Sequence, residues 1–409
     1  DGIRERTVTG VQTCALPISR DTGKPITTAR NDIKVLARYF EFYGTAADKI
    51  HGEVIPFVNG HQVSLIREPL GVTAHIIPWN YPAQMLGRTV APALAVGNAT
   101  VLKPAEDTSL SALRVAELAL EAGLPPGVLN VVTGLGEEAG AALAEHPDIN
   151  FISFTGSNEV GTLVQQAAAK NAVKCVLELG GKSPQIVFDD VDVERAVPII
   201  VRAIVQNAGQ TCTAGSRLLV QRSIFDSFVA KVAEAFSKVK VGTPEMDHEC
   251  GPVMNPAQLA RVNRYINQAR DSGVPVLAEG TLAPGVSASG YFVKPTFFGP
   301  VPRNHALACE EVFGPVLSAM PFEDEADAIA LANGTSYGLL AAVWTENAGR
   351  LQRVAKSVQA GQVFMNCYGA GGGVELPFGG TKRSGHGREK GLLALEELSS
   401  CKTLVHYHG

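Results

Sequence analysis

The sequence is poor in charge and lacks the features that mark a membrane protein or a nucleic-acid-binding protein. Only 18% of its residues are charged, the formal net charge is −5, and no run of Lys or Arg occurs. This charge balance argues against nucleic acid or an anionic membrane as the main partner. The best candidate for a membrane span, residues 89–102, is short and is broken by Pro92, Gly97 and Asn98. We therefore expect neither nucleic acid nor a membrane among its partners.

The seven cysteines include no Cys-x-x-Cys pair and no Cys and His residues at metal-ligand spacing. We therefore expect no metal site. Because their number is odd and their spacings are wide, free thiols in a reducing cytoplasm are the simplest interpretation.

The chain length and the hydrophobic pattern predict an α/β protein with more than one domain. A chain of 409 residues is too long for one small core. Strand-like and helix-like segments alternate from about residue 70 to 190 and again over 181–380, which is typical of parallel βαβ units in a doubly wound sheet. The last residues, SSCKTLVHYHG, predict a terminal strand that could pair with another chain.

The stretch FTGSNEVG predicts a strand, a turn and a helix. Gly156 and Ser157 form the turn, so the free N–H groups of the helix start could bind a phosphate. Gly156 would let the backbone approach a ligand, and Gly161 would permit tight helix packing. The alternative is an ordinary glycine turn without a ligand.

A charged pair, Lys103 and Glu106, follows the apolar strand in VLKPAEDT. At the carboxyl edge of a parallel sheet these residues could hold ribose hydroxyls. A carboxylate there would repel a 2′-phosphate, which favours NAD over NADP. The alternative is a surface charge pair beside a turn.

The carboxylate of Glu178 lies inside the apolar run VLELGGKSP. Apolar surroundings raise a carboxyl pKa, which suits a general base near neutral pH. The two glycines that follow would leave room for water or substrate. The alternative is a buried Glu held by backbone hydrogen bonds.

The tripeptide Gln-Thr-Cys occurs twice and ends at Cys14 and at Cys212. Small and polar residues surround Cys212, which predicts an exposed turn with free N–H groups, a setting that lowers a thiol pKa. Cys175 lies in an apolar strand and is expected to pack in a core. Cys212 is thus the better nucleophile candidate.

Together these stretches resemble the aldehyde dehydrogenase superfamily from about Arg20 to the C-terminus. The motifs that carry the resemblance are IIPWNYP, VLKPAE, FTGS with Gly161, LELGGKSP, GQTC, EEVFGPV and PFGGTKRSGHGREKG, all in family order. The interval from Glu178 to Cys212 also matches the family pattern.

The resemblance implies a role for each matching residue. Cys212 would be the nucleophile, Glu178 the general base and Asn80 the donor to the oxyanion. NAD would be the cofactor, with NADP the less favoured one, and a small aldehyde the substrate. Because Glu178 can activate water, the product would be a free acid. The residues implied in cofactor binding are Ile77, Trp79, Lys103, Glu106, Gly156, Ser157, Gly161, Glu311 and Phe313.

The family fold implies a Rossmann-type cofactor domain, an α/β catalytic domain and a small β oligomerisation arm. The cofactor domain would comprise 20–49 and 70–180, incomplete at its N-terminus, and the catalytic domain 181–380. The arm would comprise 50–69 and 396–409. A homodimer or a homotetramer is implied for the full-length parent.

Residues 1–19 match nothing in this family. Residues 8–18 match the in-frame translation of a common sequencing-library adapter, so we interpret 1–19 as an artefact joined to a truncated chain. On that interpretation Cys14 has no function. Three alternatives to a broad enzyme stay open: a semialdehyde dehydrogenase of narrow specificity, an inactive truncated fragment, and a non-catalytic protein that keeps the fold.

Overall fold

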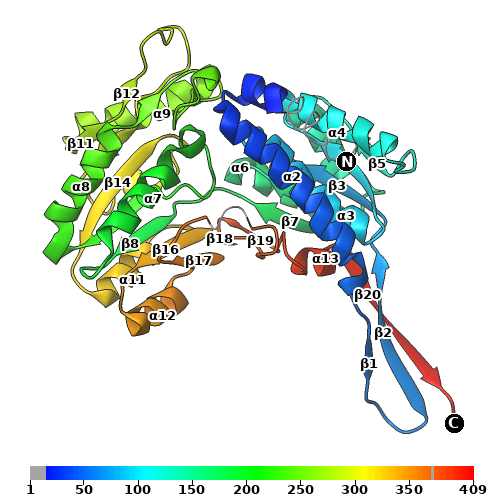
Figure 1. Ribbon diagram of the computed structural model, residues 1–409. Helices are drawn as coiled ribbons and strands as arrows, with labels where there is room; N and C mark the ends of the chain where they lie inside the picture. The colour runs from blue at the N-terminus through cyan, green and yellow to red at the C-terminus, as the bar shows by residue number, and fades with distance from the viewer. Residues whose placement is uncertain (1–14, 370–372) are drawn as a thin grey trace, which may run out of the picture.

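The computed structural model describes residues 15–369 and 373–409, and two large sheets organise it (Figure 1). The first sheet has six strands in the order β19-β7-β6-β3-β4-β5. Five of them pair in parallel, and β19 is antiparallel to β7. The strands are β3 (Val72–Ile76), β4 (Ala99–Lys103), β5 (Leu129–Val131), β6 (Phe151–Thr155), β7 (Lys174–Glu178) and β19 (Gly385–His386).

Helices cover both faces of this sheet. On one face, α2 (Ile26–Ala46) and α3 (Pro82–Ala95) pack together through Ile33 and Leu86, in a buried cluster that also contains Leu102. On the other face, α6 (Asn158–Lys170) buries Val164 against Ile152. α4 (Leu110–Glu121) follows β4. The layers thus leave the carboxyl ends of β3, β4, β6 and β7 at one shared edge.

The second sheet has seven strands in the order β11-β13-β14-β9-β8-β16-β17, parallel except for β11. Its central strands are buried on both faces, and it holds the largest hydrophobic core. The strands are β8 (Pro184–Val187), β9 (Arg217–Gln221), β11 (Val276–Glu279), β13 (Thr296–Phe298), β14 (Val316–Phe322), β16 (Leu340–Trp344) and β17 (Gln362–Met365). The helices that follow these strands are α7 (Val193–Val205), α8 (Phe225–Ser237), α9 (Pro256–Asp271), α11 (Glu325–Asn333) and α12 (Ala348–Ser357).

The apolar pattern of VERAVPIIVRAIVQNAG predicts a helix that runs to Gly209, but α7 ends at Val205. It begins at the Asp192 cap, whose side chain accepts from the Arg195 N–H. Asn207 and Ala208 adopt left-handed backbone angles, which an α-helix cannot continue. Upstream of α4, the 3₁₀ turn η2 (Glu106–Thr108) intervenes, and Ser109 stands at the helix start without a side-chain cap.

A three-stranded antiparallel arm projects from the body of the molecule (Figure 1). It comprises β1 (Glu53–Ile55), β2 (His61–Pro69) and β20 (Ser399–Tyr407). The terminal strand, β20, pairs along its length with β2 of the same chain. The arm exposes large apolar side chains, among them Val54, Phe57, Val58, Val405 and Tyr407.

Short elements complete the described chain. Residues 15–22 are helical, and Ala15 and Ile18 are buried in the same cluster as Ile33. Within 15–369 and 373–409, no helix combines the length and apolar character needed to cross a bilayer. The remaining short elements are η1 (Ala47–Lys49), η3 (Gly136–Gly140), α5 (Ala141–Glu145), η4 (Gln206–Gly209), η5 (Arg222–Ile224), β10 (Lys240–Val241), η6 (Pro244–Met246), β12 (Thr281–Leu282), α10 (Ala306–Cys309), β15 (Tyr337–Gly338), β18 (Thr381–Lys382) and α13 (Leu393–Glu397).

Candidate active site

Cys212 lies in the turn between η4 and β9 and is partly buried. Burial raises the pKa of its thiol to about 12, the positive charge of Arg88 opposes this shift, and the charges of Glu311 and Glu178 add to it. The expectation of an exposed turn with a lowered thiol pKa was therefore wrong, because surrounding elements bury a turn that is small and polar in sequence. Cys175, by contrast, is buried in a core as expected. Cys14 lies outside the described residues.

Glu178 is the last residue of β7 and is buried. Its pKa is raised well above the usual 4.5, first by burial, with Arg88 opposing and Glu389 adding to the shift. Neither carboxylate oxygen makes a hydrogen bond of normal geometry to the described residues. A backbone contact with Gly380 lowers the pKa of Glu178 by less than burial raises it, and the carboxylate keeps lone pairs available for a proton.

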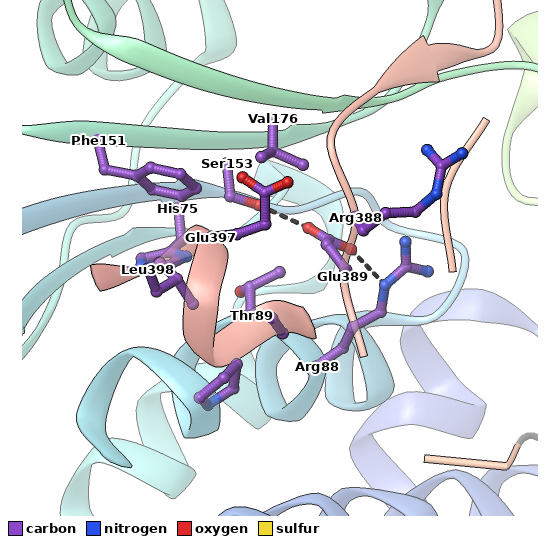
Figure 2. Close-up of a pocket in the computed structure, with 12 residues that line it drawn as sticks. His75, Arg88, Thr89, Phe151, Ser153, Val176, Arg388, Glu389, Glu397 and Leu398 are labelled. Atoms are coloured by element: carbon purple, nitrogen blue, oxygen red, sulfur yellow. Dashed lines mark hydrogen bonds and ion pairs between the residues drawn. The ribbon is translucent and has the colours of Figure 1, made fainter. Parts of the chain in front are cut away.

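A buried ion network behind Glu178 was missed at the sequence level. Arg88, on α3, lies with Nη2 3.7 Å from Glu178 Oε2 and forms an ion pair with Glu389 through Nε. The Ser153 hydroxyl donates to the second Glu389 oxygen at 2.8 Å, and Figure 2 shows Glu389 between Ser153 and Arg88. One guanidinium thus serves two buried carboxylates, so the two compete for its charge.

A cavity beside this network is lined by both polar and apolar side chains, among them His75, Thr89, Phe151 and Val176 (Figure 2). His75, on β3, is fully buried, and Thr73 Oγ1 lies 2.8 Å from its Nε2. The Thr73 hydroxyl also lies 3.2 Å from the Ala99 carbonyl. Within the described residues His75 Nδ1 and Thr89 Oγ1 have no partner, a setting that suits an ordered water.

Asn80 follows β3, and its side-chain amide reaches across to the second sheet. Its Nδ2 donates to the Gln210 carbonyl at 3.0 Å, two residues before Cys212. An amide nitrogen has two N–H groups, so this bond fixes the orientation and leaves the second N–H available. The structure therefore brings Asn80 to the turn that carries the thiol.

Three consecutive residues before that turn have positive φ angles: Asn207 at 50°, Ala208 at 52° and Gly209 at 73°. A left-handed residue other than glycine costs about 1–2 kcal/mol. Glycine is required at 209, because a Cβ there would overlap the Gly314 backbone. The nucleophile turn is therefore packed directly against the loop that follows Phe313.

Glu311 and Phe313 lie in the loop after α10 and come close to both sheets. Glu311 Oε1 accepts from the Gly181 N–H at 2.9 Å, and burial raises the pKa of Glu311 to about 7. A Cβ at Gly180 would overlap the Glu311 carboxylate. The two glycines were expected to leave room for water or substrate, but the space at Gly180 is taken by Glu311.

The ring of Phe313 meets the ring of Trp79 edge to face, with centroids 5.6 Å apart. Phe313 has a φ of 60°, and α9 holds its carbonyl through Gln258 Nε2 at 2.5 Å. Arg261, also on α9, donates to the Glu311 carbonyl at 2.6 Å. The 311–313 loop is thus fixed from one side by α9 and meets Trp79 of the first sheet on the other.

The remaining predicted cofactor residues line the carboxyl edge of the first sheet. Lys103 ends β4, and its Nζ lies 2.8 Å from Glu106 Oε2. Burial opposes ionisation of Glu106, but this bond and backbone N–H groups outweigh it and lower its pKa. Ile77 is buried, and its N–H donates to the Lys103 carbonyl at 3.1 Å.

The start of α6 can accommodate a phosphate group. Ser157 caps the helix by accepting from the Val160 N–H at 3.3 Å, so the other first-turn N–H groups stay available. A Cβ at Gly156 would lie 2.5 Å from the Phe154 ring, and one at Gly161 would lie 2.5 Å from Leu179. Both glycines are therefore needed for packing, whatever ligand binds.

Val160 and Leu163, on the same helix, were missed at the sequence level. They are 45% and 63% exposed, which is unusual for large apolar side chains beside a polar turn. An apolar surface next to free N–H groups and the Lys103–Glu106 pair fits a dinucleotide, which has a flat base, a ribose and a pyrophosphate. The residues present therefore fit NAD.

Hydroxyl groups gather beside the thiol. Tyr81 OH lies 3.0 Å from Thr211 Oγ1, and Tyr368 OH donates to the Thr213 carbonyl at 2.5 Å. Lys24 Nζ lies 3.5 Å above the centroid of the Tyr81 ring. The sequence CYGAGGGVEL predicts a loop over the substrate pocket, and its residues 370–372 lie outside the described residues.

Comparisons with known proteins agree with this site. The sequence model of the aldehyde dehydrogenase family matches residues 9–404, so the match begins before the expected start at Arg20. An aldehyde dehydrogenase of Emericella nidulans is 46% identical over 97% of this chain and 79% of the relative. The mitochondrial benzaldehyde dehydrogenase of Antirrhinum majus is 43% identical over 94% of this chain and 72% of the relative.

Solved structures give the same result. A Burkholderia cenocepacia protein assigned as an aldehyde dehydrogenase has a TM-score of 0.98 at 55% identity, covering 99% of this chain and 85% of that one. The NAD+ complex of a Bacillus cereus aldehyde dehydrogenase has a TM-score of 0.95 at 39% identity, covering 99% and 82%.

Proposed function

Since the chain belongs to the aldehyde dehydrogenase family and oxidises an aldehyde to a carboxylic acid with NAD, we propose that Cys212, Glu178 and Asn80 carry the reaction. Cys212 is the nucleophile, Glu178 the base and Asn80 a donor to the oxyanion. The observation that carries this proposal is the bond from Asn80 Nδ2 to the Gln210 carbonyl, which sets an amide donor beside the thiol turn.

The first step forms a bond between the Cys212 sulfur and the aldehyde carbon. The carbonyl π electrons move to oxygen, where the Asn80 amide and the Cys212 N–H stabilise the negative charge. Because burial raises the pKa of the thiol to about 12, the S–H proton must leave as the sulfur attacks. That proton passes to solvent water, so Glu178 stays unprotonated for the hydrolysis step.

NAD, when bound, supplies the acceptor for the hydride that leaves the carbon attached to Cys212. The start of α6 with Gly156, Ser157 and Gly161 would hold its pyrophosphate. Lys103 and Glu106 would hold the adenosine ribose, with Ile77 and Trp79 lining the cleft. Glu311 and Phe313 would position the nicotinamide ribose and ring. After the hydride has left, the acyl group remains on sulfur as a thioester.

The last step returns the enzyme to its thiol form. Glu178 takes a proton from a water molecule, the water oxygen bonds to the acyl carbon, and the C–S bond breaks. The proton held by Glu178 then passes to the departing sulfur, which restores the thiol and the carboxylate. Neither oxygen of Glu178 makes a hydrogen bond of normal geometry to the described residues, which suits this role. An activated water at this position makes a free carboxylic acid the product.

The test of this proposal is formation of NADH from NAD on addition of aldehyde, compared between the wild type and Cys212→Ala. We expect no measurable NADH from the variant, while NAD binding by calorimetry stays unchanged. An undiminished rate in a folded Cys212→Ala protein would refute the assignment.

We propose NAD rather than NADP as the preferred cofactor. Glu106 is 2.8 Å from Lys103 and keeps a lowered pKa, so it is charged at neutral pH. A carboxylate beside the expected ribose would repel a 2′-phosphate.

We propose that the arm mediates homo-oligomerisation, as a dimer or tetramer. The exposed apolar residues of β1 and β20 support this, because contact of large apolar side chains with water is unfavourable and an interface would bury them. The arm would comprise 50–69 and 396–409, the cofactor domain 20–49 and 70–180, and the catalytic domain 181–380.

The six described cysteines are all free, which supports a reducing, cytoplasmic location.

For the substrate, we propose a medium-sized aliphatic or aromatic aldehyde. The tyrosine rings and hydroxyls near Cys212 support a pocket with apolar and polar parts. A narrow semialdehyde dehydrogenase is the second candidate, and Lys24, the buried cation over the Tyr81 ring, is already paired with Asp32 at 2.5 Å. A panel of aldehydes ranked by kcat/KM separates the two, since the second candidate needs a distal carboxylate.

A further inference from the structure

Asn207 lies between α7 and the nucleophile turn, and its backbone is left-handed, with φ 50° and ψ 34°. The side chain is buried. Asn adopts this conformation more readily than most residues, and its carbonyl accepts from the Gln210 N–H at 3.0 Å. The side chain needs its own explanation.

The Asn207 amide joins the two sheets beneath the thiol. Its Nδ2 donates to the Asn80 carbonyl at 3.1 Å and to the Gln210 carbonyl at 3.1 Å. Asn80 follows β3 of the first sheet, whereas Gln210 precedes β9 of the second. One amide thus fixes backbone from both sides of the site.

The bonds form a closed cluster of Asn80, Asn207 and Gln210. The Gln210 carbonyl accepts from Asn80 Nδ2 as well as from Asn207, so both of its lone pairs are used. The Gln210 side chain donates to the Asn207 carbonyl at 3.1 Å and accepts from the Met254 N–H at 2.8 Å. Neither Asn80 nor Gln210 can shift without breaking a buried hydrogen bond.

We propose that Asn207 is a positioning residue for the oxyanion site. It holds the Asn80 backbone at a fixed distance from the Cys212 turn, so that the Asn80 amide and the Cys212 N–H point to one oxygen. Asn207 itself touches no reacting atom. The proposal rests on the oxyanion role of Asn80 proposed above.

The test compares two variants with a matched control. Asn207→Gly keeps the left-handed backbone without strain and removes both donors, while Asn207→Asp keeps the shape and places an acceptor against two carbonyls. Asn171→Gly, at the exposed end of α6, removes a single amide bond to the Glu145 carbonyl at 2.9 Å and serves as control. Melting temperature and NAD affinity show that each variant is folded.

We expect Asn207→Gly to lose about 10²-fold in kcat, near the loss of one oxyanion donor, with KM for aldehyde changed little. Alkylation of Cys212 by iodoacetamide should keep its rate, because that reaction forms no oxyanion. In the Asn80→Ala background, Asn207→Gly should add little further loss, since both act through one group.

Three results would overturn the proposal: an unchanged kcat in both folded Asn207 variants, an equal loss in alkylation rate, or fully additive losses with Asn80→Ala. If neither Asn207 variant folds at any temperature tested, Asn207 serves the fold and the positioning role is also overturned. If Asn80 has no oxyanion role, the Asn80→Ala variant alone keeps the wild-type kcat. That result distinguishes a failure of the proposed function from a failure of the positioning role of Asn207.

Discussion

The guanidinium of Arg88 lies 3.7 Å from the carboxylate of Glu178, in the buried layer beneath the candidate base. The same guanidinium pairs with Glu389 and lies 4.1 Å from the centre of the Phe378 ring. Burial raises the pKa of Glu178 and Arg88 lowers it. The pH at which the base becomes active is therefore set by a balance in which burial and Glu389 raise the pKa and Arg88 lowers it.

Replacing Arg88 should move the pH dependence of turnover. Glu178 must be unprotonated to activate water, so kcat rises with pH through its pKa. Arg88→Met removes the charge that lowers this pKa, and the rising limb should move to higher pH. Arg88→Lys keeps a cation and should move it less. If the rising part of the kcat–pH profile lies at the same pH in Arg88→Met as in the wild type, Arg88 does not lower the pKa of Glu178.

The same change should destabilise the fold. Removing one partner of a buried ion pair typically costs about 3–5 kcal/mol, because the remaining charges lose their compensation. Denaturant unfolding of Arg88→Met and Arg88→Lys measures this cost. If Arg88→Met lowers the free energy of unfolding by less than about 1 kcal/mol, Arg88 does not compensate the buried charges of Glu178 and Glu389.

Gly209→Ala should destabilise the protein more than Gly123→Ala. Both glycines have positive φ angles, 73° and 95°, so each alanine carries the backbone cost of about 1–2 kcal/mol. A Cβ at 123 meets nothing within 4 Å, whereas one at 209 overlaps the Gly314 backbone. Unfolding free energies compare the two, and equal losses would show that the turn and the 314 loop are not packed as described.

Changing Glu106 should relax the cofactor preference. Glu106→Gln removes the charge that faces a 2′-phosphate and keeps the side-chain size, so kcat/KM for NADP should rise relative to NAD by about tenfold, equivalent to about 1.4 kcal/mol. Glu121→Gln, on the exposed face of α4, is the control. An NADP to NAD ratio that is unchanged would assign the preference to other residues.

A charge on the outer arm should dissociate the oligomer. Val405 is 60% exposed on β20, and a lysine there would be buried without a partner in any interface that covers the strand. Sedimentation of Val405→Lys should give a smaller species than the wild type. Identical sedimentation would place the interface elsewhere.

The sequence predicted the positions that depend on local motifs. Glu178 and Lys103 stand at the ends of strands, and the carboxyl ends of parallel strands share one edge, so their proximity follows from the strand pattern. Ser157 caps α6 as the turn chemistry indicates.

Features that depend on tertiary packing could not be predicted. Arg88 lies on a mostly apolar helix, and its partner Glu389 is distant in sequence. The thiol pKa of Cys212 depends on burial by neighbouring elements, which a polar local sequence does not reveal. Gly180 was interpreted as free space because the Glu311 carboxylate comes from a remote loop.

The central claim is that Cys212 carries the acyl group and Glu178 releases it, and mass spectrometry of Glu178→Gln tests it most directly. Glutamine keeps the size but cannot accept a proton from water, so the thioester should accumulate after one turnover. With aldehyde and NAD, we expect one equivalent of NADH in a burst and an acyl mass on the peptide that contains Cys212. A burst with no mass added at Cys212, or steady turnover at the wild-type rate, would contradict the account.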